Sequence, residues 1–264
     1  FDLMTLDDYL TLQGAGGLLR KVIGAAYAAE YGAGVDELSS ISFLRFVHGD
    51  KRGKFAQVGR ANGIVDGEGL HVVDGNDRIA TGLAARLPTP VQLGHKLVAV
   101  RKLANGRVRL TFDVAGRSVQ TDHDAVVLTL PFSVLRDVKL DASLELPAWK
   151  RYAINNAAMG DNGKLMVGFN QPYWYIQHGA SGIGFGDRSH LQSTWETNAY
   201  NGNENRAVLT TQLGGASAKS LSPRAVQLEA MTFLDQLESA LPGAHQAAQR
   251  TGNGDVLAFA QKWS

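Results

Sequence analysis

The spacing of apolar residues changes twice along the 264-residue chain, and these changes constrain the fold more than any other feature. In residues 1–63 apolar residues recur at helical spacing, most clearly from Leu18 to Tyr31, where Gly32 is expected to end a helix. Residues 64–134 change to the shorter period of strands, and residues 135–264 mix strands with one long helix. The sequence therefore predicts an α+β fold, a mixed sheet with flanking helices.

The N-terminal zone is expected to contain three helices. Thr5 and Asp8 have the spacing of a capping box before the first helix, and the third helix is expected to begin near Asp36. Between the first two, residues 14–17 resemble a dinucleotide-binding loop. The third glycine of that pattern is replaced by Leu19, and a helical segment precedes it instead of a strand. We therefore expect a turn between two helices.

The middle zone carries the signals of several strands and one helix. A short strand at 72–73 is expected to lead through a glycine turn into a helix that ends before Pro88. The dipeptide Asn105-Gly106 predicts a hairpin turn, and the apolar run 125–130 suits a strand buried on both faces. The other strands are expected at 91–93, 96–103, 107–114 and 118–121.

The last zone is expected to contain two strands and the long helix. The strands are predicted at 164–169 and 207–213, and the helix at 223–241, where Pro242-Gly243 stops it.

Composition excludes several classes of function. The 26 Lys and Arg residues nearly balance the 25 Asp and Glu residues, so a general electrostatic attraction to nucleic acid or to an anionic membrane is not expected. Cysteine is absent, which excludes disulfides and thiolate chemistry. No apolar run is long enough to span a membrane, and no metalloprotease, nucleophile-elbow or Walker motif occurs. Residues 74–77 begin like a calcium loop but lack the later ligands, so no metal site is predicted.

The chain begins at Phe1 and shows no signal peptide, so we expect a segment of a longer protein or a processed chain. The sequence favours no compartment, and it allows a homo-oligomer without predicting one.

The order of several short motifs resembles that of the flavin-dependent amine oxidases, the family of the monoamine, L-amino-acid and polyamine oxidases. The resemblance extends over almost the whole chain. In chain order the motifs lie at 25–32, 37–40, 73–79, 126–131, 164–169, 172–174, 194–197, 209–210 and 214–215.

This resemblance implies a discontinuous FAD-binding domain and a substrate domain. Residues 64–134 would be the middle piece of the FAD-binding domain with a β-meander, 1–63 the helical part of the substrate domain, and 135–264 its sheet and helix. The Gly-rich FAD loop and the last FAD-binding piece of the family would lie outside this chain. The implied reaction is oxidation of a primary or secondary amine, or an amino acid, to an imine, with oxygen reduced to hydrogen peroxide. The isolated segment is expected to be inactive.

The resemblance also assigns roles to individual residues. Lys164 would reach toward flavin N5 through a water molecule, where a cation favours the reduced, more anionic flavin. A solvent-exposed lysine at a strand end is the simpler alternative. The residues expected to contact FAD are Gly75, Asn76, Leu97, Thr129 and Pro131.

Five aromatic residues are candidates for a pocket that holds an apolar amine substituent. Each of them also fits a place in the hydrophobic core. They are Phe169, Tyr173, Trp174, Phe185 and Trp195.

Two other functions remain open at this point. The chain could be a non-catalytic binding or structural fragment that does not bind flavin alone. It could also belong to a related flavoprotein, such as a carotenoid desaturase or a porphyrinogen oxidase. The Lys164 strand favours the amine branch.

Overall fold

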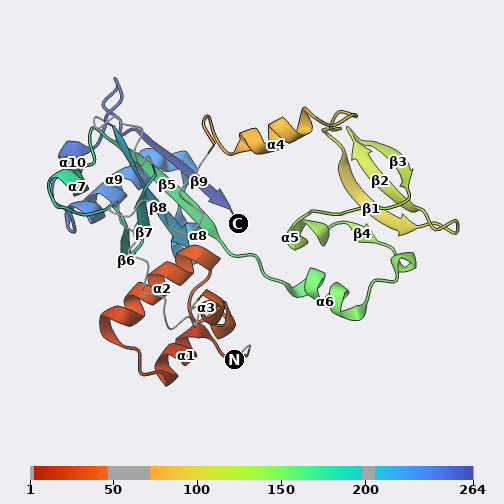
Figure 1. The fold of residues 1–264 in the computed structure, drawn as a ribbon, viewed down its shortest axis with the longest axis horizontal. Coiled ribbons are helices and arrows are strands. Elements are labelled where there is room, and N and C mark those ends of the chain that lie inside the picture. Colours follow the sequence, from red (N-terminus) through yellow and green to blue (C-terminus); the bar gives the residue numbers. More distant parts are fainter. Residues whose placement is uncertain (1–2, 47–71, 198–205, 264) are drawn as a thin grey trace. The chain divides into compact units, whose positions relative to one another are not determined.

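A computed structural model describes residues 3–46, 72–197 and 206–263 (Figure 1). Its contacts divide the chain into two compact units. The first unit holds the described residues up to 46 together with those from Gly160 onward, and the second holds residues 72–159. Residues 135–159 therefore group with the middle zone, whereas the sequence places them with the C-terminal sheet.

Three helices form the N-terminal part of the first unit, as predicted. They are α1 (Leu6–Leu12), α2 (Gly17–Tyr31) and α3 (Ser40–Phe46). Thr5 caps α1, because its hydroxyl accepts a hydrogen bond of 3.0 Å from the backbone N–H of Asp8. Gly32 ends α2 with a φ of +70°, and a turn joins α1 to α2. The third helix begins at Ser40 instead of Asp36, because residues 35–37 form a turn.

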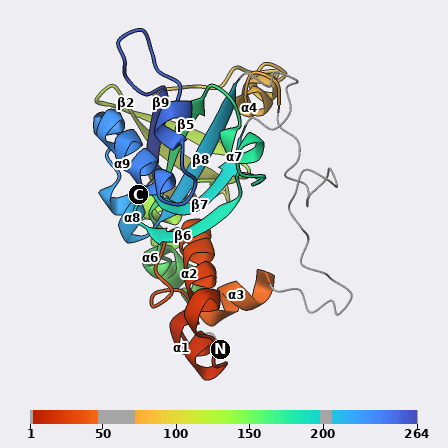
Figure 2. The ribbon, with the colours of Figure 1, turned by 90° about the vertical axis from the view of Figure 1, so that its left-hand side faces the viewer.

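A five-stranded antiparallel sheet forms the rest of the first unit (Figure 2). Its strand order is β6-β7-β8-β5-β9. Helices α9 and α10 pack against one face, where fully buried Leu165, Val167, Leu209 and Phe233 belong to one core cluster. The strands are β5 (Asn162–Phe169), β6 (Gly184–Arg188), β7 (Leu191–Glu196), β8 (Ala207–Gly214) and β9 (Ala258–Trp263). The helices are α7 (Tyr173–Ile176), α8 (Ala216–Ser220), η3 (Pro223–Ala225), α9 (Val226–Glu238) and α10 (Ala244–Ala247).

The second unit contains a four-stranded sheet with the order β3-β2-β1-β4, in which β4 runs parallel to β1. Gly106, with a φ of +84°, lies in the turn between β1 and β2, so the predicted hairpin is confirmed. The strands are β1 (Lys96–Lys102), β2 (Val108–Val114), β3 (Arg117–His123) and β4 (Lys139–Leu140). The helices are α4 (Asp77–Ala84), α5 (Phe132–Leu135), η2 (Ala142–Leu144) and α6 (Ala148–Asn156).

The two units together confirm the α+β class. The mixed sheet is the one in the second unit, whereas the five-stranded sheet is antiparallel throughout. The strands predicted at 164–169 and 207–213 are confirmed as β5 and β8, and the long helix as α9.

Three predicted strands are wrong. Residues 125–130 are extended but pair with no strand of the described chain, and Val127 is 86% exposed. An apolar run favours burial, but a strand also needs a neighbouring strand for its backbone hydrogen bonds. Among the described residues, no strand pairs with 125–130. Residues 72–73 lead into a turn in which Asp74 and Gly75 have positive φ, and 91–93 lead into a turn at Gly94.

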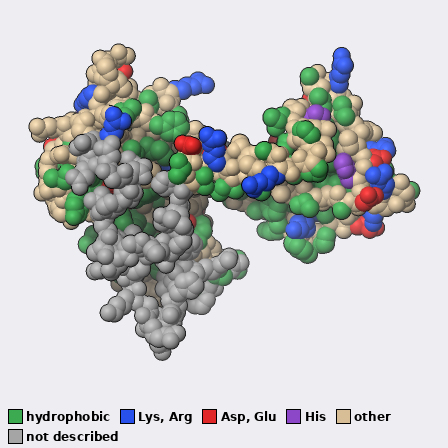
Figure 3. Space-filling model, turned by 45° about the horizontal axis from the view of Figure 1, so that its top comes forward, with side chains coloured by type: hydrophobic (Ala, Val, Ile, Leu, Met, Phe, Trp, Pro, Cys, Tyr) green, Lys and Arg blue, Asp and Glu red, His purple; other side chains and the backbone are tan. Residues whose placement is uncertain are grey.

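The second unit exposes many large hydrophobic side chains. On α4, Ile79 is 56% and Leu83 60% exposed, and the helix has no buried residue. The space-filling view shows hydrophobic side chains gathered on one side of this unit, the right-hand body (Figure 3). Such apolar surface is typical of regions that contact other protein or a ligand.

Candidate functional site

The face of the five-stranded sheet turned away from α9 is the candidate functional site. Side chains alternate along β5, so the core residues Leu165 and Val167 leave Lys164 and Met166 on the opposite face. The strand register places further residues on the same face, which we call the Lys164 face. These residues are Phe185, Ser193, Trp195, Val208, Thr210, Gln212, Phe259, Gln261 and Trp263.

Lys164 lies on β5, between β8 and the edge strand β9. Its cross-strand neighbours are two neutral amides, Gln212 on β8 and Gln261 on β9. The Nζ atom lies 5.3 Å from the centroid of the Trp195 ring, within range of a cation–π interaction. In the described part of the chain Lys164 pairs with no carboxylate. The ammonium can therefore donate hydrogen bonds to a water molecule or a ligand.

On the Lys164 face, aromatic side chains lie on strands to either side of β5. Phe185 is 48% exposed on β6, and Trp195 is half-buried on β7. Phe259 and Trp263 on β9 are 58% and 51% exposed, and neither is among the five aromatic residues predicted to line a pocket. The signal that could have found them is the alternation along 258–263, in which the two alanines face the core.

The other three aromatic candidates are core residues. Phe169, Tyr173 and Trp174 are each 0% exposed, and their ring centroids lie 5.2 to 5.6 Å apart. The Trp174 Nε1–H donates to Glu196 Oε2 at 3.1 Å, and the Tyr173 hydroxyl donates to the carbonyl of Leu241 at 3.1 Å. Burial raises the pKa of Tyr173. These side chains hold α7 against the sheet, so a pocket-lining role now has the weaker support.

In the second unit, two of the five predicted FAD contacts come together. Leu97 and Thr129 line a hollow of about 500 Å³ between β1, β2, α5 and the extended segment 126–130. Its remaining lining residues are His95, Lys96, Val98, Leu110, Phe112, Val126, Val127, Leu128, Leu130, Val134, Asp137 and Val138.

The other three predicted FAD contacts lie outside this hollow. Pro131 precedes α5 directly. Gly75 and Asn76 lie in the turn before α4, where Gly75 has a φ of +110° and Asn76 Oδ1 accepts from the backbone N–H of Val72 at 2.9 Å.

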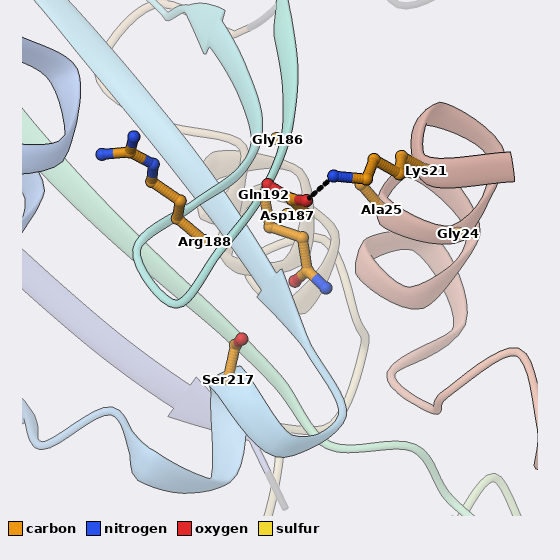
Figure 4. Close-up of a pocket in the computed structure, with 8 residues that line it drawn as sticks. All are labelled: Lys21, Gly24, Ala25, Gly186, Asp187, Arg188, Gln192 and Ser217. Atoms are coloured by element: carbon orange, nitrogen blue, oxygen red, sulfur yellow. Dashed lines mark hydrogen bonds and ion pairs between the residues drawn. The ribbon is translucent and has the colours of Figure 1, made fainter. Parts of the chain in front are cut away.

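A smaller pocket of about 270 Å³ lies in the first unit between α2, the β6–β7 hairpin and α8 (Figure 4). Lys21 and Asp187 pair across it at 2.8 Å, and this hydrogen bond lowers the pKa of Asp187. The guanidinium of Arg188 points away from this pair and donates to Ser239 Oγ at 2.7 Å. Because Lys21 and Asp187 neutralise one another, the pocket offers a ligand little charge, and we assign it no role.

Two classes of site are not found in the described residues. No group of three metal-binding side chains occurs among them, and residues 73–76 form the turn that leads into α4. Within the same residues, no helix is long and apolar enough to cross a membrane.

Sequence comparison connects the chain with amine oxidases. The family model of the flavin containing amine oxidoreductases matches residues 13–264. Probable polyamine oxidase 4 of Arabidopsis thaliana is 29% identical over 108 residues, which make up 41% of this chain and 20% of that protein. Polyamine oxidase 3 of Oryza sativa subsp. japonica is 31% identical over 84 residues, or 32% of this chain and 16% of that protein.

Solved structures of similar fold cover almost the whole chain. Putrescine oxidase bound to putrescine has a TM-score of 0.71 at 17% identity, and the match covers 99% of this chain and 54% of that one. Cyclohexylamine oxidase from Brevibacterium oxydans IH-35A has a TM-score of 0.69 at 17% identity, with the same coverage. The chain thus spans about half the length of these structures. At such low identity the similarity shows the fold alone, whereas the family model, which matches nearly every residue, shows that this chain belongs to the flavin-containing amine oxidoreductases.

Proposed function

We propose that the protein containing this chain oxidises an amine at the Lys164 face, with FAD as its cofactor and oxygen as the final electron acceptor. The observation that carries the proposal is the position of Lys164. It lies on the sheet face opposite the core, over the Trp195 ring and without a carboxylate partner among the described residues. A lysine with only a structural role would more often pair with an acid or point into solvent.

The second unit offers groups that fit part of FAD. The hollow beside Leu97 and Thr129 is mostly apolar, as a site for an adenine ring would be. The extended segment 125–130 beside it is outside the ladders of the described strands, so its backbone N–H and C=O groups can hydrogen-bond a ligand. We propose that Leu97, Thr129 and Pro131 contact the nucleotide, together with Gly75 and Asn76.

When bound, FAD would accept a hydride equivalent from the carbon next to the amine nitrogen. In this proposal Lys164 donates a hydrogen bond to a water molecule at the reacting end of the amine and holds positive charge there. Trp195 keeps the ammonium in place through its ring face. Phe185 and Trp195 contact the apolar part of the amine and exclude water from it.

The experiment is a Lys164→Met substitution in the FAD-loaded full-length protein. Methionine keeps the length of the side chain but removes the charge. We expect flavin reduction by amine, or reoxidation by oxygen, to slow by about ten-fold or more, which is about 1.4 kcal/mol of barrier. Stopped-flow absorbance measures both steps. Lys262→Met, at the adjacent strand β9 but on the other side of the sheet, is the matched control and should change neither rate.

Two results would contradict the proposal. If the FAD-loaded protein produces no hydrogen peroxide from any amine, the assigned reaction is wrong. If Lys164→Met leaves both rates within about two-fold of the parent, Lys164 is a structural residue.

We further propose that the isolated 264-residue chain is inactive and binds FAD weakly. The Gly-rich loop that normally binds the pyrophosphate through several backbone N–H groups does not occur in its sequence. Titration of the purified chain, followed by flavin fluorescence, tests this. Stoichiometric binding at micromolar or lower FAD concentration would contradict it.

A further inference from the structure

We infer that the Lys164 face selects amines with an uncharged, apolar body and rejects amines that carry a second positive charge. The inference rests on the proposed function, because it names the substrate class of the same site. It separates this chain from the polyamine and putrescine oxidases that it matches in sequence and fold.

The charges on the Lys164 face are the reason to expect that it rejects a second positive charge. Among the described residues that the register places on it, Lys164 is the one ionisable group. The two positions beside it hold neutral amides, Gln212 and Gln261, and the Gln212 Nε2–H donates to the carbonyl of Ala29 on α2 at 2.7 Å. The acid next in sequence to Trp195 is Glu196, whose side chain is on the opposite side of β7 and accepts from the buried Trp174 Nε1–H.

A second ammonium group would therefore bind unfavourably. An alkylamine, like lysine, is protonated at neutral pH unless its surroundings shift its pKa. A diamine bound with one nitrogen at the reacting position would keep a charge at its other end. Among the sheet residues named above as the Lys164 face, that charge would find no acid. A neutral alkyl, cycloalkyl or aryl group would not incur this penalty.

The apolar side chains on the Lys164 face are the reason to expect that it selects an apolar substrate body. Met166 on β5 lies opposite Phe259 on β9, with Lys164 two residues before Met166 on the same face. Phe185 lies on the other side of Lys164, next to the strand of Trp195. Large apolar side chains of this kind bind a hydrocarbon body by removing its surface from water.

Three six-carbon amines test how the charge at the far end of the substrate affects turnover. They are hexylamine, 1,6-diaminohexane and 6-aminohexanoate, whose far ends are neutral, positive and negative. We expect kcat/KM for hexylamine to exceed that for 1,6-diaminohexane by about 30-fold or more in the FAD-loaded full-length protein. We also expect it to exceed that for 6-aminohexanoate, because the face is mostly apolar.

A pair of variants tests the face itself. Phe259→Glu places a carboxylate beside Met166, and Phe259→Gln has nearly the same shape without the charge. Phe259 is 58% exposed, so neither change should disturb the core. We expect Phe259→Glu to raise the ratio of diamine to hexylamine turnover by about ten-fold or more relative to Phe259→Gln. Equal melting temperatures of the two variants would show that both are folded.

The outcomes distinguish this inference from the proposed function. Equal use of hexylamine and 1,6-diaminohexane would overturn the inference and leave amine oxidation intact. A preference for 6-aminohexanoate would also overturn it, since Lys164 would then pair with a substrate carboxylate. Turnover of none of the probes, nor of any other amine, would overturn both.

Discussion

Lys164 and Trp195 meet on one face of the sheet although their strands are not neighbours. Strand β8 lies between β5 and β7, yet the Lys164 Nζ is 5.3 Å from the centroid of the Trp195 ring. On β8, Thr210 is the cross-strand neighbour of Trp195 and is fully buried, and Gln212 is that of Lys164. The aromatic ring thus supports a cation that no carboxylate of the described residues neutralises, which is the arrangement that the proposed function requires.

Trp195 should affect the rate of flavin reduction through its contact with Lys164. We expect Trp195→Leu to slow flavin reduction, and Trp195→Phe, which keeps an aromatic face, to slow it less. In a double-mutant cycle with Lys164→Met the coupling should be about 0.5–2 kcal/mol, the range of a cation–π contact. Stopped-flow rates of the four proteins give this value. A coupling of zero would mean that Trp195 contributes only to packing or to the pocket wall.

The aromatic residues that the sequence predicts as one pocket should differ in how much each contributes to the free energy of unfolding. Trp174→Ala removes a fully buried ring and leaves Glu196 without its indole donor, so we expect a loss of about 3–5 kcal/mol. Phe185→Ala removes a ring that is 48% exposed and should cost about 1 kcal/mol or less. Urea unfolding followed by circular dichroism measures both. Equal losses would mean that Trp174 is not a core residue.

Gly214 should tolerate no side chain. A Cβ atom at this position would lie 1.6 Å from the carbonyl oxygen of Ala28, so the end of β8 and helix α2 could not both keep their places. We expect Gly214→Ala to destabilise the protein by about 1–3 kcal/mol or more. Gly252→Ala is the matched control, because a Cβ there would meet nothing within 4 Å. Similar melting temperatures for the two variants would contradict the close contact between α2 and β8.

Glu238 should make the stability depend on pH. Its carboxylate accepts hydrogen bonds from the backbone N–H groups of Gly243 at 2.9 Å and His245 at 3.1 Å, and these bonds lower its pKa. Because the pKa of Glu238 is lower in the folded state than in the unfolded state, its ionised carboxylate stabilises the fold at pH values above the ordinary glutamate pKa of about 4.3. This stabilisation is lost as the pH falls through the pKa of Glu238 in the folded state.

The variant Glu238→Gln tests this dependence. It should melt at a lower temperature than the parent at pH 7, and the difference should shrink below about pH 4. Glu30→Gln, at an exposed position of α2, is the control and should follow the parent at both pH values. A difference that stays constant with pH would mean that the charge of Glu238 is unimportant.

The sequence by itself determined those elements whose signals lie within a few residues. Thr5 caps α1, Gly32 ends α2 in the left-handed region, and Gly106 turns the β1–β2 hairpin, each as predicted. The alternation along β5 likewise predicted the strand that carries Lys164. These signals suffice because capping, turn geometry and side-chain alternation depend only on neighbouring positions.

Only the tertiary structure decided which apolar segments are paired and which aromatic side chains are buried. The sequence predicts strands at both 125–130 and 207–213, but only the second pairs with neighbouring strands, β5 and β7. Trp174 and Trp195 look alike as aromatics near strands, yet one lies in the core and the other over Lys164. Pairing and burial depend on segments far away in the chain, so no local pattern could have placed Trp195 beside Lys164.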